Sequence, residues 1–344
     1  METLSPRQPA TSQPAIRAVG LEKRFGDVQA LCGIDLEVPV GSVIGLLGPN
    51  GAGKTTTVRI LTTATKASGG HAEVLGIDVA RDPDAVRDQI GLAGQYAAVD
   101  GNLSGRENLA LIGKLTHIRR SELGPRVDAL LDKFGLTHAA DRLARTYSGG
   151  MRRRLDLAAA LVHHPPVLFL DEPTTGLDPQ GRNDLWEVID QLSGEGTTIL
   201  LTTQYLEEAD RLADDIVVID GGRVIAQGTP AELKARLGST VVEIGFGDEH
   251  TAARASTLLA PFAVRPAERT GHSVHLEVVD GPRELIAIMR TLDRDELEPL
   301  SLVVREPSLD DVFLSLTGHR AEARDDEEAV ESDPASPVAD RGAA

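Results

Sequence analysis

Hydrophobic and polar positions form two alternating kinds of segment between residues 15 and 236. Short apolar runs rich in β-branched residues predict buried strands, as in VIGLLG, VLFLD, TILLT and IVVID. Longer segments with an apolar residue at every third or fourth position predict helices, as in KTTTVRILTTAT and RNDLWEVIDQL. Because strands and helices alternate, the pattern favours an α/β fold built on a mainly parallel sheet.

Two regions depart from this alternation. Between about 98 and 165 the strand-like runs disappear, and GRENLALIGKL and ELGPRVDALLDKF predict successive helices, which indicates a helical subdomain inside the α/β domain. Over residues 237–318, VVEIGF and SVHLEVV alternate with the helical segments GPRELIAIMRTL and PSLDDVFLSL, where Ser308 and Asp311 have the spacing of a capping box. We therefore expect a small α+β accessory domain after the larger one.

Composition adds limits on partners and location. The two termini, 1–14 and 319–344, contain few apolar residues that could be buried, and both are predicted to be disordered. The C-terminal one is an acidic tail. A net charge of −18 spread along 344 residues argues against nucleic acid as a partner. The single cysteine, Cys32, excludes an intramolecular disulfide and a cysteine-cluster metal site. Neither a signal peptide nor an apolar run of about 18 residues is present, so we expect no direct membrane span.

The segment VIGLLGPNGAGKTT contains the pattern G-x-x-x-x-G-K-T from Gly48 to Thr55, between a predicted strand and a predicted helix. Backbone N–H groups of such a loop approach phosphates, Lys54 would reach the β- and γ-phosphates, and the Thr55 hydroxyl would complete a Mg²⁺ shell. An ordinary glycine-rich turn is the alternative, but the strand–loop–helix context favours mononucleotide binding. The candidate phosphate-binding residues are Gly48, Asn50, Gly51, Gly53, Lys54, Thr55 and Thr56.

Two adjacent carboxylates end the predicted strand VLFLDEP. Asp171 suits a Mg²⁺ position beside the phosphate loop, and Glu172 is placed to act as general base on an attacking water. The alternative is a pair of acids that caps a helix before Pro173.

Between these motifs, TYSGGMRRRLDLAAALV places Ser148, Gly149 and Gly150 before a helix whose free N–H groups attract anions. Alone, this pattern is commonly just a helix entry. The three arginines at 152–154 point around the helix, and we expect them to be mostly solvated or paired.

Taken together, GPNGAGKTT, YSGGM, LFLDEP and GLD at 176–178 resemble the Walker A, signature, Walker B and D-loop motifs of the ATP-binding cassette (ABC) ATPases. The resemblance covers residues 15–236. It implies a P-loop NTPase fold with a RecA-like core, an antiparallel β subdomain and a helical subdomain, with ATP and Mg²⁺ as cofactors. It also implies a head-to-tail homodimer, in which Ser148, Gly149 and Gly150 of one subunit face the γ-phosphate bound by the other.

The same resemblance implies roles for three further residues. Phe25, in EKRFGDVQAL, matches the aromatic residue that stacks on adenine, with a core phenylalanine as the alternative. Gln95, in GLAGQYAAVD, matches the Q-loop glutamine that touches Mg²⁺ or the attacking water, with a surface amide as the alternative. Asp178 matches the D-loop aspartate beside the nucleotide.

One position departs from the family pattern. Most ABC ATPases carry a switch histidine after the strand that follows Walker B, and here that position is Gln204, in LLTTQYLEEAD. A glutamine can donate an N–H to a phosphate oxygen but cannot become cationic. We therefore expect Gln204 to position the γ-phosphate while Glu172 acts as base. With TYSGGMRRRLDLA and SLDDVFLSLTGH, this departure resembles the daunorubicin/doxorubicin-resistance ATP-binding branch, through to about residue 318.

An ATPase of this kind without a membrane segment most simply drives a separate integral membrane permease. The branch that it resembles implies an ABC-2 type exporter of an antibiotic or hydrophobic drug, with the ATPase at the cytoplasmic face of the cell membrane. A lipid or polysaccharide exporter is the alternative cargo assignment. Two other classes are disfavoured. A soluble non-transport ABC ATPase usually has tandem cassettes, whereas this chain has one. A regulatory scaffold that binds ATP without hydrolysing it would be expected to lose Lys54, Glu172 or Ser148, and all three are present.

Overall fold

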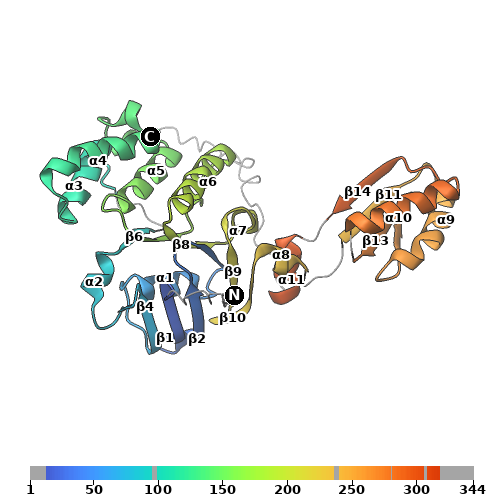
Figure 1. The fold of residues 1–344 in the computed structure, drawn as a ribbon, viewed down its shortest axis with the longest axis horizontal. Helices are drawn as coiled ribbons and strands as arrows, with labels where there is room; N and C mark the ends of the chain where they lie inside the picture. Colours follow the sequence, from blue (N-terminus) through green and yellow to red (C-terminus); the bar gives the residue numbers. More distant parts are fainter. Residues whose placement is uncertain (1–12, 95–98, 236–239, 280, 306–307, 318–344) are drawn as a thin grey trace, which may run out of the picture.

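The structure is a computed structural model that describes residues 13–94, 99–235, 240–279, 281–305 and 308–317. The termini that we predicted to be disordered, 1–14 and 319–344, lie outside these ranges apart from residues 13 and 14. A central sheet, a second sheet beside it, a helical lobe and a C-terminal unit make up the described chain (Figure 1).

Six strands form the central sheet in the order β10-β9-β3-β8-β7-β6. All neighbours are parallel except β9 and β10, which pair antiparallel. The α/β fold with a mainly parallel sheet is therefore confirmed. The strands are β3 (Val43–Leu47), β6 (Ile90–Ala93), β7 (Val167–Asp171), β8 (Thr198–Thr203), β9 (Asp215–Asp220) and β10 (Arg223–Gly228).

Both faces of this sheet are covered, which explains why its strands are apolar runs rather than alternating ones. Along β7, Leu168 and Leu170 pack into the core shared with the helical lobe, while Val167 and Phe169 pack into the core on the opposite face. The helices on the first face are α3 (Gly105–Leu115), α4 (Arg120–Lys133), α5 (Gly149–Ala160) and α6 (Pro179–Gly194), with short 3₁₀ turns at Thr137–Ala139 and Ala144–Thr146.

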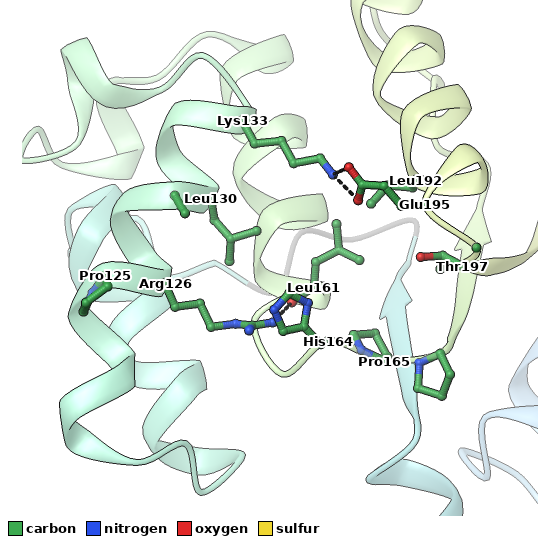
Figure 2. A pocket seen from close by; sticks show the side chains of 13 residues that line it. Pro125, Arg126, Leu130, Lys133, Leu161, His164, Pro165, Leu192, Glu195 and Thr197 are labelled. Atoms are coloured by element: carbon green, nitrogen blue, oxygen red, sulfur yellow. Dashed lines mark hydrogen bonds and ion pairs between the residues drawn. The ribbon is translucent and has the colours of Figure 1, made fainter.

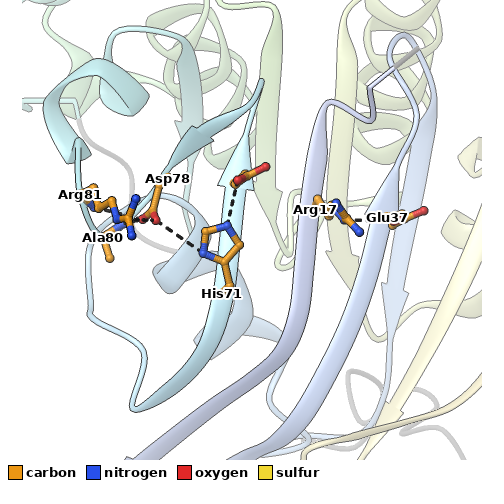
Figure 3. A network of polar contacts seen from close by, with 7 residues as sticks. Arg17, Glu37, His71, Asp78, Ala80 and Arg81 are labelled. Carbon is orange, nitrogen blue, oxygen red and sulfur yellow. Dashed lines mark hydrogen bonds and ion pairs between the residues drawn. The ribbon is translucent and has the colours of Figure 1, made fainter. Parts of the chain in front are cut away.

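The second face carries α1 (Lys54–Leu61) and an antiparallel sheet of order β2-β1-β4-β5. The outer side of this sheet is polar: Arg17 pairs with Glu37 across β1 and β2, and the ring of His71 lies between Glu73 and Asp78 (Figure 3). Exposed pairs of this kind add little stability, so the sheet is held by its apolar inner side. Its strands are β1 (Ile16–Phe25), β2 (Val28–Val38), β4 (Gly69–Val74) and β5 (Ile77–Asp78), and α2 (Pro83–Arg87) follows.

The C-terminal unit has the order β-α-β-β-α-β and the sheet order β12-β13-β11-β14, which is the split βαβ arrangement of ferredoxin-like folds. It has a hydrophobic core of its own, built around Ile244, Leu276 and Ile288. The predicted α+β character is therefore confirmed. Its elements are β11 (Thr240–Gly245), α9 (Glu249–Leu259), a 3₁₀ turn (Ala260–Phe262), β12 (Glu268–Thr270), β13 (Ser273–Val278), α10 (Gly281–Arg294) and β14 (Ser301–Arg305).

The last helix, α11 (Leu309–Thr317), does not join that core. Leu309, Val312 and Phe313 instead pack against α7 (Leu206–Leu212), α8 (Pro230–Ala235) and the end of the central sheet. Ser308 and Asp311 exchange backbone-to-side-chain hydrogen bonds at 2.9 and 3.2 Å, so the predicted capping box is confirmed. The split βαβ unit is thus inserted between two helices that touch each other on the larger domain.

We expect Phe313→Ala to detach α11 from the larger domain, because a side chain that is 4% exposed would leave a cavity costing about 3–5 kcal/mol. Hydrogen exchange of α11 and α7 amides should then accelerate. Leu314→Ala is the matched control, since Leu314 is 42% exposed on the same helix and its truncation should change little. Equal exchange rates in both variants would contradict this packing role.

Candidate active site

The loop between β3 and α1 has a backbone that only glycine allows at two points. Gly48 has φ +157° and Gly53 has φ +115°. A Cβ at Gly48 would lie 2.1 Å from the Ile219 carbonyl oxygen, and one at Gly53 would lie 2.6 Å from Leu31 Cδ2. The loop is therefore a cradle pressed against β9 and β2, with backbone rather than side chains at its surface.

Lys54 begins α1 and is 4% exposed. Its ammonium group donates to the carbonyl oxygens of Gly48 and Pro49, at 2.6 and 3.1 Å, so it lies over the loop. The other predicted phosphate-binding residues, Asn50, Gly51, Thr55 and Thr56, lie along the same loop and first helical turn, and Asn50, Gly51 and Thr55 are exposed.

The structure brings together two of the three predicted Mg²⁺ ligands from distant parts of the chain. The Thr55 hydroxyl lies 3.1 Å from Asp171 Oδ1, and the Thr202 hydroxyl donates to the same oxygen at 2.6 Å. A hydroxyl and a carboxylate at the end of a phosphate-binding loop are ligands that Mg²⁺ prefers, so the residues fit the ion. Gln95, the third predicted metal contact, lies outside the described residues.

Glu172 adopts φ +50°, which is unusual for a non-glycine residue and costs about 1–3 kcal/mol. Its N–H donates to the Thr202 carbonyl and hydroxyl, both at 3.1 Å, and these bonds help to hold the turn. Neither Asp171 nor Glu172 caps a helix, because α6 begins later and is capped by Asp178. The capping alternative for the acid pair is thus wrong.

Gln204 follows β8 directly and is half-buried. Because Asp171 on β7 is paired in register with Thr202 on β8, Glu172 and Gln204 follow neighbouring strand ends at the same edge of the sheet. This edge also carries the loop before α1, since β3 pairs with β8. The structure therefore assembles the phosphate loop, the acid pair and Gln204 along one edge.

Phe25 ends β1 and is 50% exposed, with Lys23 Nζ 4.7 Å from its ring centroid, so it is not a core residue.

Ser148 caps α5 by accepting from the Met151 N–H, and a Cβ at Gly149 or Gly150 would meet nothing within 4 Å. This surface belongs to the helical face of the sheet, opposite to α1 (Figure 1). Asp178 uses its carboxylate to cap α6.

The expectation that the arginines at 152–154 are solvated or paired is confirmed, since Arg152 is exposed, Arg153 pairs with Asp156 and Arg154 pairs with Asp184 at 3.8 Å. That expectation gave none of them a role at the site, and so it missed Arg153 as a functional candidate. Its side chain is only 11% exposed, and burial lowers the pKa of its guanidinium group. It pairs with Asp156 at 3.1 Å and donates to four carbonyl oxygens that follow two strands of the sheet. These belong to Gly94 after β6 and to Asp171, Glu172 and Pro173 at the end of β7.

Glu208 on α7 is the second missed candidate. It is fully buried and accepts from the Trp186 indole N–H at 3.2 Å. Burial raises the pKa of its carboxyl group, and the hydrogen bond from Trp186 opposes this effect. It follows Gln204 by four residues in the chain.

The sequence did contain one signal of buried charge. Asp156 is an acid inside the apolar run LDLAAAL, and a buried carboxylate requires a cation nearby.

Comparison with known proteins agrees with this geometry. The ABC transporter family matches residues 31–175, and the family described as ATP-binding protein DrrA1-3-like, C-terminal domain, matches residues 228–317. A solved structure titled as cbiO1 from Clostridium perfringens, part of an ABC transporter complex, superimposes with a TM-score of 0.61 and 29% identity. It covers 66% of this chain and 92% of its own.

Two curated relatives extend the similarity over nearly the whole chain. The daunorubicin/doxorubicin resistance ATP-binding protein DrrA of Streptomyces peucetius is 49% identical, covering 93% of this chain and 97% of its own length. The Nod factor export ATP-binding protein I of Ralstonia nicotianae is 42% identical, covering 89% and 95%. No helix of the described residues is long and apolar enough to cross a bilayer. The chain therefore belongs to the daunorubicin/doxorubicin resistance ATP-binding proteins of the ABC transporter family, whose members bind ATP with Mg²⁺ and hydrolyse it to energise export.

Proposed function

We propose that this protein energises the efflux of an antibiotic or other hydrophobic drug through a separate ABC-2 type permease, as a homodimer at the cytoplasmic face of the membrane. The observation that carries the proposal is the cluster of Thr55, Asp171 and Glu172 at one sheet edge, in a chain 49% identical to a named drug-resistance ATPase subunit.

Each residue at this edge has a proposed role in hydrolysis. Lys54 binds the β- and γ-phosphates, and Glu172 takes the proton of the attacking water. Gln204 donates an N–H to a γ-phosphate oxygen and holds it in position. Thr55 and Asp171 would hold Mg²⁺, whose positive charge would offset the negative charge of the phosphate oxygens. Phe25 offers its exposed ring to the adenine, Asp178 contributes from the D-loop, and Gln95 has the role at Mg²⁺ or the attacking water that the family resemblance implies.

The site of a single chain lacks one part. Ser148 and the two following glycines lie on the helical face, away from the phosphate loop, with open space around them. A second copy arranged head to tail would bring this surface to the γ-phosphate. ATP would then close the dimer, and the helical lobe would pass the movement to the permease.

A second candidate function is the export of a lipid or polysaccharide. The relative named for Nod factor export, at 42% identity, favours keeping this alternative, because closely similar chains energise the export of different cargo. The site itself does not discriminate, since the residues that bind nucleotide need not touch the cargo.

The test of cargo is drug-stimulated hydrolysis in membranes that contain this protein and its permease. We expect daunorubicin to raise the ATPase rate of the wild type. Glu172→Gln should lose both basal and stimulated rates by about 10²- to 10⁴-fold, because the amide cannot accept the proton. If basal hydrolysis were robust but no candidate drug changed its rate, the cargo would instead be assigned as a lipid or polysaccharide.

We expect Gln204→Ala to lower kcat roughly ten- to hundred-fold without a comparable loss of ATP binding, because one hydrogen bond to a charged oxygen is removed. Gln204→His is the variant to compare with Gln204→Ala. It should restore turnover and make kcat depend on pH near the pKa of histidine, about 6.5. Steady-state kinetics and nucleotide titration measure both effects. Wild-type turnover in Gln204→Ala would remove Gln204 from the mechanism.

We expect Arg153→Lys to lower kcat by roughly ten- to hundred-fold while ATP affinity stays near wild type. Lysine keeps the charge beside Asp156 but cannot donate to all four carbonyl groups, so the turn that carries Glu172 loses its support. Arg152→Lys is the matched control on the same helix, because Arg152 is exposed. If both variants hydrolysed ATP equally fast, Arg153 would have only a structural role.

A further inference from the structure

A pocket of about 600 Å³ lies at the end of the sheet opposite to the active site. It is lined by α4, by the segment from Leu161 to Pro166 that precedes β7, and by the turn between α6 and β8. The acid pair and Gln204 follow the other ends of the same two strands. The pocket is therefore separate from the nucleotide site, and it bridges the helical lobe and the central sheet.

Arg126 places a positive charge on this pocket without a full set of partners. Its Nη2 donates to the Leu161 carbonyl oxygen at 3.1 Å, and its Nε is buried and has no hydrogen-bond partner. Burial lowers the pKa of this guanidinium, and Glu122, four residues earlier, opposes that effect but forms its ion pair with Arg119. Within the described ranges, Arg126 makes no ion pair. A half-buried guanidinium with an unsatisfied N–H and no ion pair is suited to bind an anion.

The other charges of the pocket do not cancel this one. Lys133 and Glu195 neutralise each other through an ion pair of 2.7 Å that joins α4 to the end of α6, and Arg126 extends from α4 toward the Leu161–His164 segment (Figure 2). Burial, with the charges of Arg126 and Lys133, lowers the pKa of His164, which favours its neutral form. The net charge of the lining is thus close to +1.

The remaining lining is largely apolar. Leu130, Leu161 and Leu192 come from α4, the end of α5 and α6, and prolines complete the wall. A volume of this size and a mostly apolar wall with one charged group are typical of sites for small organic ligands. The complement of this lining is a molecule with one negative charge on an apolar body.

We propose that this pocket binds an amphiphilic organic anion, with its carboxylate on the Arg126 guanidinium and its apolar body against the three leucines. Arg126 also donates to the carbonyl of Leu161, the C-terminal cap of α5, the helix whose N-terminal cap is Ser148. A ligand bound here therefore acts on one end of the helix whose other end faces the second subunit in the proposed dimer, and this consequence rests on the proposed function. Its binding does not depend on the transported cargo.

The test uses the full-length protein and decanoate as the probe, with calorimetric titration and thermal unfolding as readouts. We expect saturable binding that raises the unfolding temperature with decanoate concentration. 1-Decanol, the neutral molecule of equal chain length, should bind at least roughly ten-fold more weakly, because it lacks the charge-assisted hydrogen bonds.

Three variants separate the charge from the shape of the pocket. Arg126→Gln should weaken decanoate binding roughly ten-fold or more, and Ala129→Phe should weaken it by filling the pocket while leaving Arg126 in place. Arg120→Gln, on the exposed start of the same helix, should bind like the wild type. ATP binding checks that each variant is folded. Equal affinity in wild type and both pocket variants, equal affinity for 1-decanol, or no binding of decanoate would overturn the proposal.

Discussion

The turn that carries Glu172 is held, together with Thr202, by one buried cation, the guanidinium of Arg153. A guanidinium group has five N–H donors and, once buried, needs acceptors for them. Carbonyl groups after the ends of β6 and β7 have left their strand ladders and need donors. The N–H donors of Arg153 and these carbonyl acceptors therefore satisfy one another, and the carboxylate of Asp156 balances the positive charge of Arg153. Because Arg153 is five residues after Ser148, the same contact fixes the start of α5 relative to Glu172.

The residues predicted from sequence are those whose chemistry is local. Gly48, Lys54 and Thr55 form a motif within eight residues, and the alternation of apolar runs was enough to place β3, β7 and β8 in a parallel sheet. Arg153 and Glu208 were missed because their burial depends on which elements pack around them. An arginine among arginines, or a glutamate in an acidic helix start, has the same local pattern whether it faces solvent or the core. Only Asp156, inside an apolar run, carried a signal.

The attachment of the split βαβ unit shows the same limit of sequence interpretation. The apolar face of α11 indicates that the helix must pack on something, but Leu309, Val312 and Phe313 would satisfy that need equally well on either core. The structure places them on α7 and α8. Helices α8 and α11, which flank the unit in sequence, therefore share one hydrophobic core with α7, the helix that follows Gln204. A force on the unit would reach the larger domain through this shared core.

The two arginines at the ends of α5 differ in how completely they are satisfied. Arg153, near the N-terminal end, has an ion pair and several carbonyl acceptors, so its surroundings are over-determined and rigid. Arg126, from α4, has one carbonyl acceptor at the C-terminal end and a buried N–H without a partner. A site can influence another only if its own state can change. In the proposed ligand response, the end of α5 that can change is thus the one at the pocket, while the end near Ser148 stays fixed to the turn that carries Glu172.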